Sequence, residues 1–381
     1  TETTTETKTE TKTATATETE AATETETDTR TKTHTKAETE TETKTKTVTQ
    51  KTIVKINADD YNIDILEALS ATGLRSIRYF NEIANVNSIV ANDFSQDAVD
   101  AIRRNVEFNG LNTETQVLPN RDDASALMYR CKADAGDSDA RKKSYAVIDL
   151  DPYGSAAPFL DSAVQTVENG GLLCITCTDM AVLAGNHPEA CYAKYGSMPL
   201  RGPFCHEMAL RIVLGSVNQH AARYKRYIVP MMSCSIDFYC RIFVRVYESA
   251  LEVKRSASKM SHVYSCTSCD SFYLQPVCKV ESKGNSTKFK PATGPPMPQL
   301  CKACSKTFQI GGPIWSDPIH NVDFVTELLA EVEENSSKYG TFTRMKGFLN
   351  VISEELPDYP LYYTTPSLSN TVHCTTMRLL E

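Results

Sequence analysis

The stretch that decides the fold reads Tyr145-Ala-Val-Ile-Asp-Leu-Asp-Pro-Tyr-Gly-Ser155. Its first six residues form an apolar run with β-branched side chains, which predicts a buried strand. Pro152 then ends the strand because it cannot donate to a sheet ladder, and Gly154 permits a sharp turn. We therefore expect the Asp151 carboxylate and the Tyr153 ring on a stiff corner at the carboxyl end of a strand, where open α/β sheets bind ligands.

This corner has a functional and an ordinary interpretation. A carboxylate can accept a hydrogen bond from an exocyclic amine, and a flat ring can stack on the same base, as methylation of a nucleobase amino nitrogen requires. The same residues are also typical of a β-turn with proline at its second position. The sequence on either side favours the functional interpretation.

Strands and helices alternate along residues 53–250, which predicts a doubly wound, mostly parallel α/β sheet with Tyr145 to Leu150 as its fourth strand. We expect the other strands at 63–69, 88–91, 115–118 and 172–178, and helices at 74–85, 96–109, 122–128, 159–167 and 205–217. Residues 180–202 are expected to be irregular. Residues 227–232 and 238–247 should form a closing antiparallel pair.

A turn of small residues follows the first strand, in Glu67-Ala-Leu-Ser-Ala-Thr-Gly-Leu-Arg-Ser-Ile-Arg78. Such a turn lets the backbone approach a ligand, and the helix after it favours an acidic group. Asp93 ends the second strand and can hold ribose hydroxyls. The turn is not G-x-G-x-x-G, so it suits S-adenosylmethionine better than a dinucleotide. Asp123 is either an acceptor for the adenine amine or a helix cap. The predicted cofactor residues of the turn are Ser70, Thr72 and Gly73.

Two C-x-x-C pairs, Cys266-Thr-Ser-Cys269 and Cys301-Lys-Ala-Cys304, predict a zinc site, because tetrahedral zinc takes four thiolate or imidazole ligands. The gap between the pairs exceeds the roughly 15–20 residues of compact zinc ribbons. Cys278 is therefore a rival ligand, and four free thiols are the alternative. Four thiolates leave no open position for water, so we expect the zinc to be structural.

Charge is distributed unevenly along the 381 residues, whose net charge is −8. Residues 201–260 hold 10 Lys/Arg against 4 acids, and we expect them to form a basic stripe that holds a nucleic-acid backbone. Residues 1–50 alternate Thr with Glu, Lys or Ala and offer no apolar face, which predicts disorder.

The chain has no apolar run of transmembrane length and no secretory h-region, so we expect no membrane association. Without a secretion signal, its 13 cysteines are expected to be mostly buried thiols in a reducing compartment. The protein is therefore predicted to be nuclear, mitochondrial or cytoplasmic rather than secreted.

Taken together, these motifs resemble the tRNA (guanine(26)-N2)-dimethyltransferases of eukaryotes and archaea. The resemblance runs from about residue 64 to residue 381. Members of that family begin with a Phe-Tyr-Asn-Pro…Phe-Asn-Arg-Asp segment, whose arginine reaches the active site. Here the Thr-rich tract stands in its place, and the family's C-terminal domain continues beyond residue 381. The resemblance is carried by residues 68–78, 91–93, 103–106, 149–155, 176–185, 205–211 and 311–315 and by both cysteine pairs.

The resemblance implies transfer of two methyl groups from S-adenosylmethionine to guanine N2 in tRNA. Asp93 and Asp123 would hold the cofactor, Asp151 would be the catalytic carboxylate, and the Pro152 carbonyl and the Tyr153 ring would help to hold the base. Composition divides the chain into three parts: a low-complexity segment (1–52), a Rossmann-like class I methyltransferase domain (53–250) and a smaller, zinc-containing C-terminal α/β domain (251–381). By the resemblance, the last of these binds tRNA.

Two other functions stay open. Adenine-N6 and cytosine-N4 methyltransferases use a similar acid- or amide-Pro-Pro-aromatic corner, but Gly154 stands where they usually carry the aromatic residue, and the cysteine pairs also weigh against them. A catalytically impaired tRNA-binding or chaperone protein is the alternative from another class. Cofactor binding separates the two classes, because a pure binding module has no need of S-adenosylmethionine.

Overall fold

The computed structural model describes residues 62–133, 144–284 and 286–375. The predicted disordered segment 1–52 lies outside these residues. Among the helices of the described ranges, none combines the length and the apolar character that crossing a membrane requires.

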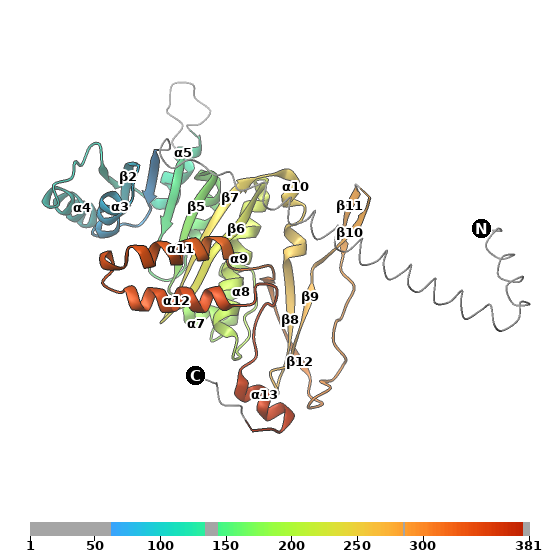
Figure 1. Cartoon of the computed structure of the whole chain (residues 1–381). Helices are drawn as coiled ribbons and strands as arrows, with labels where there is room; N and C mark the ends of the chain where they lie inside the picture. Colours follow the sequence, from blue (N-terminus) through green and yellow to red (C-terminus); the bar gives the residue numbers. More distant parts are fainter. Residues whose placement is uncertain (1–61, 134–143, 285, 376–381) are drawn as a thin grey trace, which may run out of the picture. The chain divides into compact units, whose positions relative to one another are not determined.

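A seven-stranded sheet with the order β3-β2-β1-β4-β5-β7-β6 organises the first part of the chain (Figure 1). β1 to β5 pair in parallel, and β7 is antiparallel to both β5 and β6. The predicted α/β sheet with a closing antiparallel pair is therefore confirmed. Glu67 of β1 lies opposite Asp149 of β4, so these two strands end level with each other. The strands are β1 Ile63–Glu67, β2 Val86–Asp93, β3 Val117–Arg121, β4 Tyr145–Leu150, β5 Val167–Cys177, β6 Arg226–Ile236 and β7 Tyr239–Glu248.

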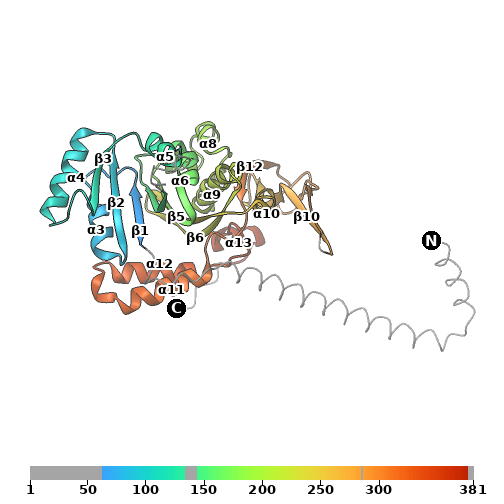
Figure 2. The ribbon, with the colours of Figure 1, turned by 90° about the horizontal axis from the view of Figure 1, so that it is seen from above.

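Helices cover both faces of this sheet, because alternate residues of a strand point to opposite faces. Leu66 of β1 packs with the core under α5, α6 and α9, whereas Ile65 packs with α3 and α4. Figure 2 shows α5, α6 and α9 on one side and the later helices α11 and α12 on the other. The helices are α3 Leu74–Glu82, α4 Gln96–Phe108, α5 Ala124–Ala133, α6 Ala157–Thr166, α7 Met180–Leu183, α8 Pro188–Tyr195 and α9 Cys205–Arg223.

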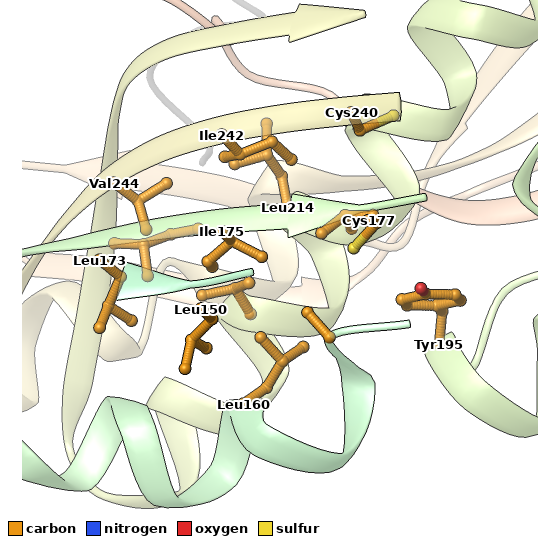
Figure 3. Close-up of a cluster of buried hydrophobic side chains, with 14 of the residues drawn as sticks. Leu150, Leu160, Leu173, Ile175, Cys177, Tyr195, Leu214, Cys240, Ile242 and Val244 are labelled. Carbon is orange, nitrogen blue, oxygen red and sulfur yellow. The ribbon is translucent and has the colours of Figure 1, made fainter. Parts of the chain in front are cut away.

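The core around β4 is densely filled with buried side chains. In Figure 3, side chains from β4, β5, β7, α6 and α9 converge on one cluster, in which Leu150, Leu160 and Leu214 are fully buried. Complete burial of a leucine side chain contributes about 1.5–3 kcal/mol. The strand that carries the Asp151 corner is therefore anchored from both its neighbours and the helices behind it.

The expectation that residues 180–202 are irregular is wrong, because they contain α7 and α8. Pro188 is the first residue of α8, where its missing N–H costs nothing, and Gly196 ends the helix in the left-handed conformation with φ 68°. These are recognisable start and stop signals. The helix is only eight residues long, so its apolar periodicity is too short to be noticed.

Several predicted boundaries also differ. β5 begins at Val167, so Gly171 lies inside the strand instead of in a turn before it. A Cβ atom at position 171 would lie 2.9 Å from the Ala146 carbonyl oxygen. Glycine is needed there because the neighbouring strand β4 packs too closely for a side chain. Three helices and strands illustrate the shift: the helix predicted at 74–85 ends at residue 82, the strand predicted at 115–118 lies at 117–121, and the helix predicted at 205–217 continues to residue 223. The other predicted ranges that differ are 63–69 (observed 63–67), 88–91 (86–93), 96–109 (96–108), 122–128 (124–133), 159–167 (157–166), 172–178 (167–177), 227–232 (226–236) and 238–247 (239–248).

The chain after residue 250 is a mixed region of strands and helices. β12, β8 and β9 form an antiparallel sheet, and β10 and β11 form a separate two-stranded ribbon. Trp315 is buried in the main core, and Arg211 of α9 donates to its carbonyl oxygen at 3.0 Å. The elements are α10 Ala250–Val253, β8 Met260–Cys266, β9 Phe272–Pro276, β10 Cys278–Lys283, β11 Ser286–Pro291, β12 Phe308–Trp315, α11 Val322–Glu334, α12 Phe342–Glu354 and α13 Thr365–Val372.

Candidate functional site

The turn between β1 and α3 has the backbone that the sequence predicts. Gly73 precedes α3 with φ 74°, and its N–H donates to the Ser70 carbonyl at 2.8 Å. A Cβ atom at position 73 would also lie 3.1 Å from the Ile102 side chain. Both the positive φ and this close approach therefore favour glycine at the position. Ser70 is buried and its hydroxyl donates to the Glu67 carbonyl, whereas Thr72 is exposed. Thr72 and the backbone, rather than the Ser70 hydroxyl, face outward.

Asp93 is held against this turn. Its Oδ2 accepts from the Ala71 N–H at 3.0 Å and its Oδ1 from the Ser95 N–H at 3.0 Å. The structure thus brings together the turn and the acid at the end of β2, as predicted. A carboxylate has about four acceptor positions, so two backbone amides leave room for ligand hydroxyls.

Asp123 caps α5, since its Oδ1 accepts from the Ala126 N–H at 2.8 Å. The helix-cap interpretation of this residue is therefore confirmed. Its contact with an adenine amine stays a prediction.

The Asp151 corner is clamped to the end of β5. The Gly154 N–H donates to the Thr178 hydroxyl at 2.7 Å, and the Thr178 N–H donates back to the Gly154 carbonyl at 2.8 Å. Gly154 has φ 84°, and Pro152 is buried. Tyr153 is fully exposed. The corner therefore presents a free aromatic ring on a fixed backbone.

Three charged residues that the sequence analysis did not place in the site lie beneath this corner. Arg75 of α3 donates from Nη1 to Asp149 at 3.0 Å and pairs through Nη2 with Asp151. Arg241 of β7 donates to the other oxygen of Asp149 at 2.8 Å. Burial would raise the pKa of Asp149, but Arg241 and Arg75 hold it below its usual range. Asp149 is thus a buried anion that anchors Arg75.

A second buried carboxylate, Glu67, lies at the end of β1. Its Oε2 accepts from the Ser76 N–H at 3.0 Å and from the Ser76 hydroxyl. Burial nevertheless raises the pKa of Glu67 to about 7. The carboxylate therefore serves as a fixed link between the turn and the first turn of α3.

Four of the ten Lys/Arg residues that were expected to form a basic stripe at 201–260 are engaged within the fold. Arg211, Arg226 and Arg241 are buried or nearly so and pair with Glu207, Glu248 and Asp149 at 2.7–2.8 Å. Arg245 donates to a backbone carbonyl. These arginines hold the fold together, because a buried charge is stable only when it is paired, and they do not offer their charge to a polyanion.

Four exposed lysines gather on one face of the β10–β11 ribbon. Lys279 lies opposite Lys290, and Glu281 lies opposite Lys288, so all four share a face with Lys283. Glu281 pairs with Lys279 at 3.3 Å and with Lys290 at 2.5 Å. We call Lys279, Lys283, Lys288 and Lys290 the lysine face. With Glu281 its formal charge is +3 (four lysines minus one glutamate).

The four cysteines of the C-x-x-C pairs form one cluster. Their sulfur atoms lie within 4.8 Å of one another, with Cys266 and Cys304 at 3.3 Å and Cys269 and Cys301 at 3.5 Å. Zinc–sulfur bonds of about 2.3 Å give a tetrahedron with edges of about 3.8 Å, so the cluster could hold a metal. Cys278, the rival ligand, lies outside the group found in the described residues.

Both pairs are shaped by the same local turn. The residue after each second cysteine, Asp270 or Ser305, is in the left-handed conformation with φ 58° or 57°. In each turn the N–H of the first cysteine, Cys266 or Cys301, bonds to a carbonyl five residues on. Burial would raise the pKa of Cys301, but backbone N–H groups of Cys304 and Ala303 lower it to about 6. Thiolate formation, which metal binding needs, is thus favoured there.

Comparisons with known proteins identify the family of this chain. A model of the family "N2,N2-dimethylguanosine tRNA methyltransferase" matches residues 15–381. The tRNA (guanine(26)-N(2))-dimethyltransferase of Mus musculus is 52% identical over 318 residues, which are 83% of this chain and 47% of that protein. The mitochondrial enzyme of that name from Saccharomyces cerevisiae is 43% identical over 327 residues, 83% of this chain and 56% of that protein.

Among solved structures, a complex of Trm1 from Pyrococcus horikoshii with S-adenosyl-L-methionine superposes with a TM-score of 0.67 at 30% identity. The match covers 82% of this chain and 76% of that chain. The chain spans about half the length of the curated relatives it matches.

Proposed function

This chain belongs to the N2,N2-dimethylguanosine tRNA methyltransferase family, and on that premise we propose that it transfers methyl groups from S-adenosylmethionine to the exocyclic N2 of guanine 26 in tRNA, giving N2,N2-dimethylguanosine. One observation carries the proposal. The turn after β1, with Asp93 against it, and the Asp151 corner after β4 lie at the same end of adjacent strands. A methyl donor in the turn and a base at the corner would therefore meet.

The residues around the turn fit S-adenosylmethionine. Asp93 would hold the ribose hydroxyls, Asp123 would accept from the adenine amine, and Thr72 with the backbone near Gly73 would hold the amino-acid end. Leu74 and Phe94, next in sequence to the turn and to Asp93, are 66% and 77% exposed, and a bound nucleoside would cover such apolar surface. When bound, this cofactor supplies an already activated methyl group.

The corner would orient the acceptor. Guanine N2 is a poor nucleophile because its lone pair is delocalised into the ring. Asp151 would accept one N–H and the Pro152 carbonyl the other, which raises electron density on nitrogen and aligns it with the donor. Tyr153, fully exposed on the corner, would stack on the base. A paired guanine must first be flipped out of the tRNA body to reach this position.

We propose that residues 53–250 form the methyltransferase domain, and that residues 251–381 contain a tRNA-binding domain built on a structural zinc. Cys266, Cys269, Cys301 and Cys304 would be the zinc ligands, which their shared cluster supports. The lysine face would contact the tRNA backbone, because an ordered row of exposed ammonium groups suits phosphates. All 13 cysteines are free thiols in the described residues, which favours a reducing compartment: nucleus, mitochondrion or cytoplasm.

Mass spectrometry of nucleosides tests the proposal. The chain is incubated with S-adenosylmethionine and unmodified tRNA, in parallel with a transcript that carries adenine at position 26. We expect N2-methyl- and N2,N2-dimethylguanosine from the first RNA and neither from the second. A methylated adenine or cytosine would point to a different nucleobase methyltransferase. Binding of tRNA without any methylation would point to a tRNA-binding or chaperone protein.

A further inference from the structure

Arg75 joins the two halves of the candidate site. It is the second residue of α3 and follows directly on the turn after β1, while its guanidinium reaches the end of β4. Asp149 is the fifth residue of β4, and Asp151 directly follows the last residue of that strand. The guanidinium fork spans them, with Nη1 at 3.0 Å from Asp149 and Nη2 on Asp151.

Neutralising Asp149 does not by itself explain this arginine. Asp149 also accepts hydrogen bonds from Arg241 at 2.8 Å and from the Tyr79 hydroxyl at 2.7 Å. Its buried charge thus has a cation and a further donor besides Arg75. The side chains of Arg75 and Asp151 are 34% and 27% exposed, so their contact lies at the open end of the sheet and not in the core.

The contact fixes which oxygen of Asp151 is available. Arg75 engages Oδ2 of Asp151, which leaves Oδ1 as the acceptor for a ligand. An unrestrained aspartate rotates about its terminal torsion, which is broad and roughly two-fold. A guanidinium donor on one oxygen, itself anchored by a buried carboxylate, removes that freedom. Without the guanidinium, the Asp151 oxygen that accepts from the guanine amine could move by about 1 Å, and a misplacement of that size can lower a rate about 100-fold.

We propose that Arg75 is a positioning residue for methyl transfer: anchored on Asp149, it holds Oδ2 of Asp151 so that Oδ1 accepts the N–H of the exocyclic amine. This inference rests on the proposed function. Because Arg75 also lies in the first turn of the helix that follows the cofactor turn, it couples the position of the acceptor to the position of the methyl donor. Arg75 thus acts on Asp151, the residue proposed to orient the reacting amine. Its loss should therefore lower the rate of methyl transfer and leave the affinities for S-adenosylmethionine and tRNA unchanged.

The test compares Arg75→Ala, Arg75→Lys and the control Arg78→Ala in single-turnover methylation of tRNA. Arg78 lies on the same helix and pairs only with Glu82 among the described residues, in an exposed contact at 2.7 Å. We expect Arg75→Ala to lower the rate roughly 10- to 100-fold, as loss of a charge-assisted hydrogen bond does. Its affinities for S-adenosylmethionine and tRNA should stay within about threefold, less than 1 kcal/mol.

Chemical rescue of the Arg75→Ala variant distinguishes a positioning role of Arg75 from a role in stability alone. Methylguanidinium added to Arg75→Ala should restore part of the rate, and Arg75→Lys should retain an intermediate rate, whereas Arg78→Ala should resemble the unmutated chain in both respects. The inference is overturned if Arg75→Ala matches Arg78→Ala, or if its loss of rate comes with loss of cofactor binding and no response to methylguanidinium. An unmutated chain that methylates no tRNA would overturn the proposed function, and this inference with it.

Discussion

Neutralising two lysines of the ribbon should change how tRNA binding depends on salt. Lys279 and Lys290 both pair with Glu281, whereas within the described residues no ion pair engages Lys283 or Lys288. Each phosphate contact contributes a slope of about −0.7 to −0.9 to the plot of log K against log salt concentration. Lys283→Gln with Lys288→Gln should therefore flatten the slope by about 1.4 to 1.8. Between ~50 and ~200 mM salt, the unmutated chain should lose about tenfold more affinity than the double variant.

Fluorescence anisotropy of labelled tRNA, titrated at several salt concentrations, measures this slope. Glu281→Gln is the matched control on the same face, because it releases Lys279 and Lys290 and should tighten binding. Affinity for S-adenosylmethionine should be unchanged in both variants. A double variant with the slope of the unmutated chain would show that the lysine face does not contact phosphates.

Three further changes test the proposed roles. Asp151→Ala should abolish methyl transfer while affinity for S-adenosylmethionine stays within a few-fold; a rate within about tenfold of the unmutated chain, about 1.4 kcal/mol, would contradict its role. Asp93→Ala should weaken cofactor binding by about 1.5–3 kcal/mol per lost hydrogen bond, and calorimetry with unchanged affinity would remove Asp93 from the ribose site. Elemental analysis should find one zinc per chain, lost in Cys266→Ser and Cys301→Ser. Chelation should weaken tRNA binding but spare cofactor binding, and a content well below one zinc in protein prepared without chelators would exclude the metal.

Local sequence was sufficient where the signal is local. The strand Tyr145–Leu150 has the predicted bounds at both ends, because an apolar run stops at a proline corner. The four cysteines assemble as predicted, because the C-x-x-C spacing fixes the turn of each pair and the pairing of β8 with β12 places the two turns side by side. Ala71 of the turn and Asp93 meet because the ends of adjacent parallel strands share one edge of a sheet.

Local sequence was insufficient where partners are distant. Arg75 meets Asp149 only because β1 and β4 are neighbours, and Arg241 reaches it only because β7 enters the sheet beside β5. The residues around Arg241 in the sequence contain no pattern that predicts its contact with Asp149. For the same reason the number of Lys/Arg residues in 201–260 overestimates the exposed positive charge of this segment, because ion pairs within the fold bury several of its arginines.

β7 lies between β5 and β6 in the sheet, yet it follows both of them in the sequence. During synthesis it therefore emerges from the ribosome after the two strands with which it pairs. While residues 178–238 are being synthesised, the apolar edge of β5 has no neighbour on that side, and an unpaired edge is a template for wrong pairing. We therefore expect nascent chains that stop short of β7 to depend on chaperones, and Asp149 to acquire its second arginine only when the β6–β7 hairpin docks. Ribosome-bound chains probed with protease should become resistant in the whole sheet at once, after residue 248 has emerged, and not strand by strand.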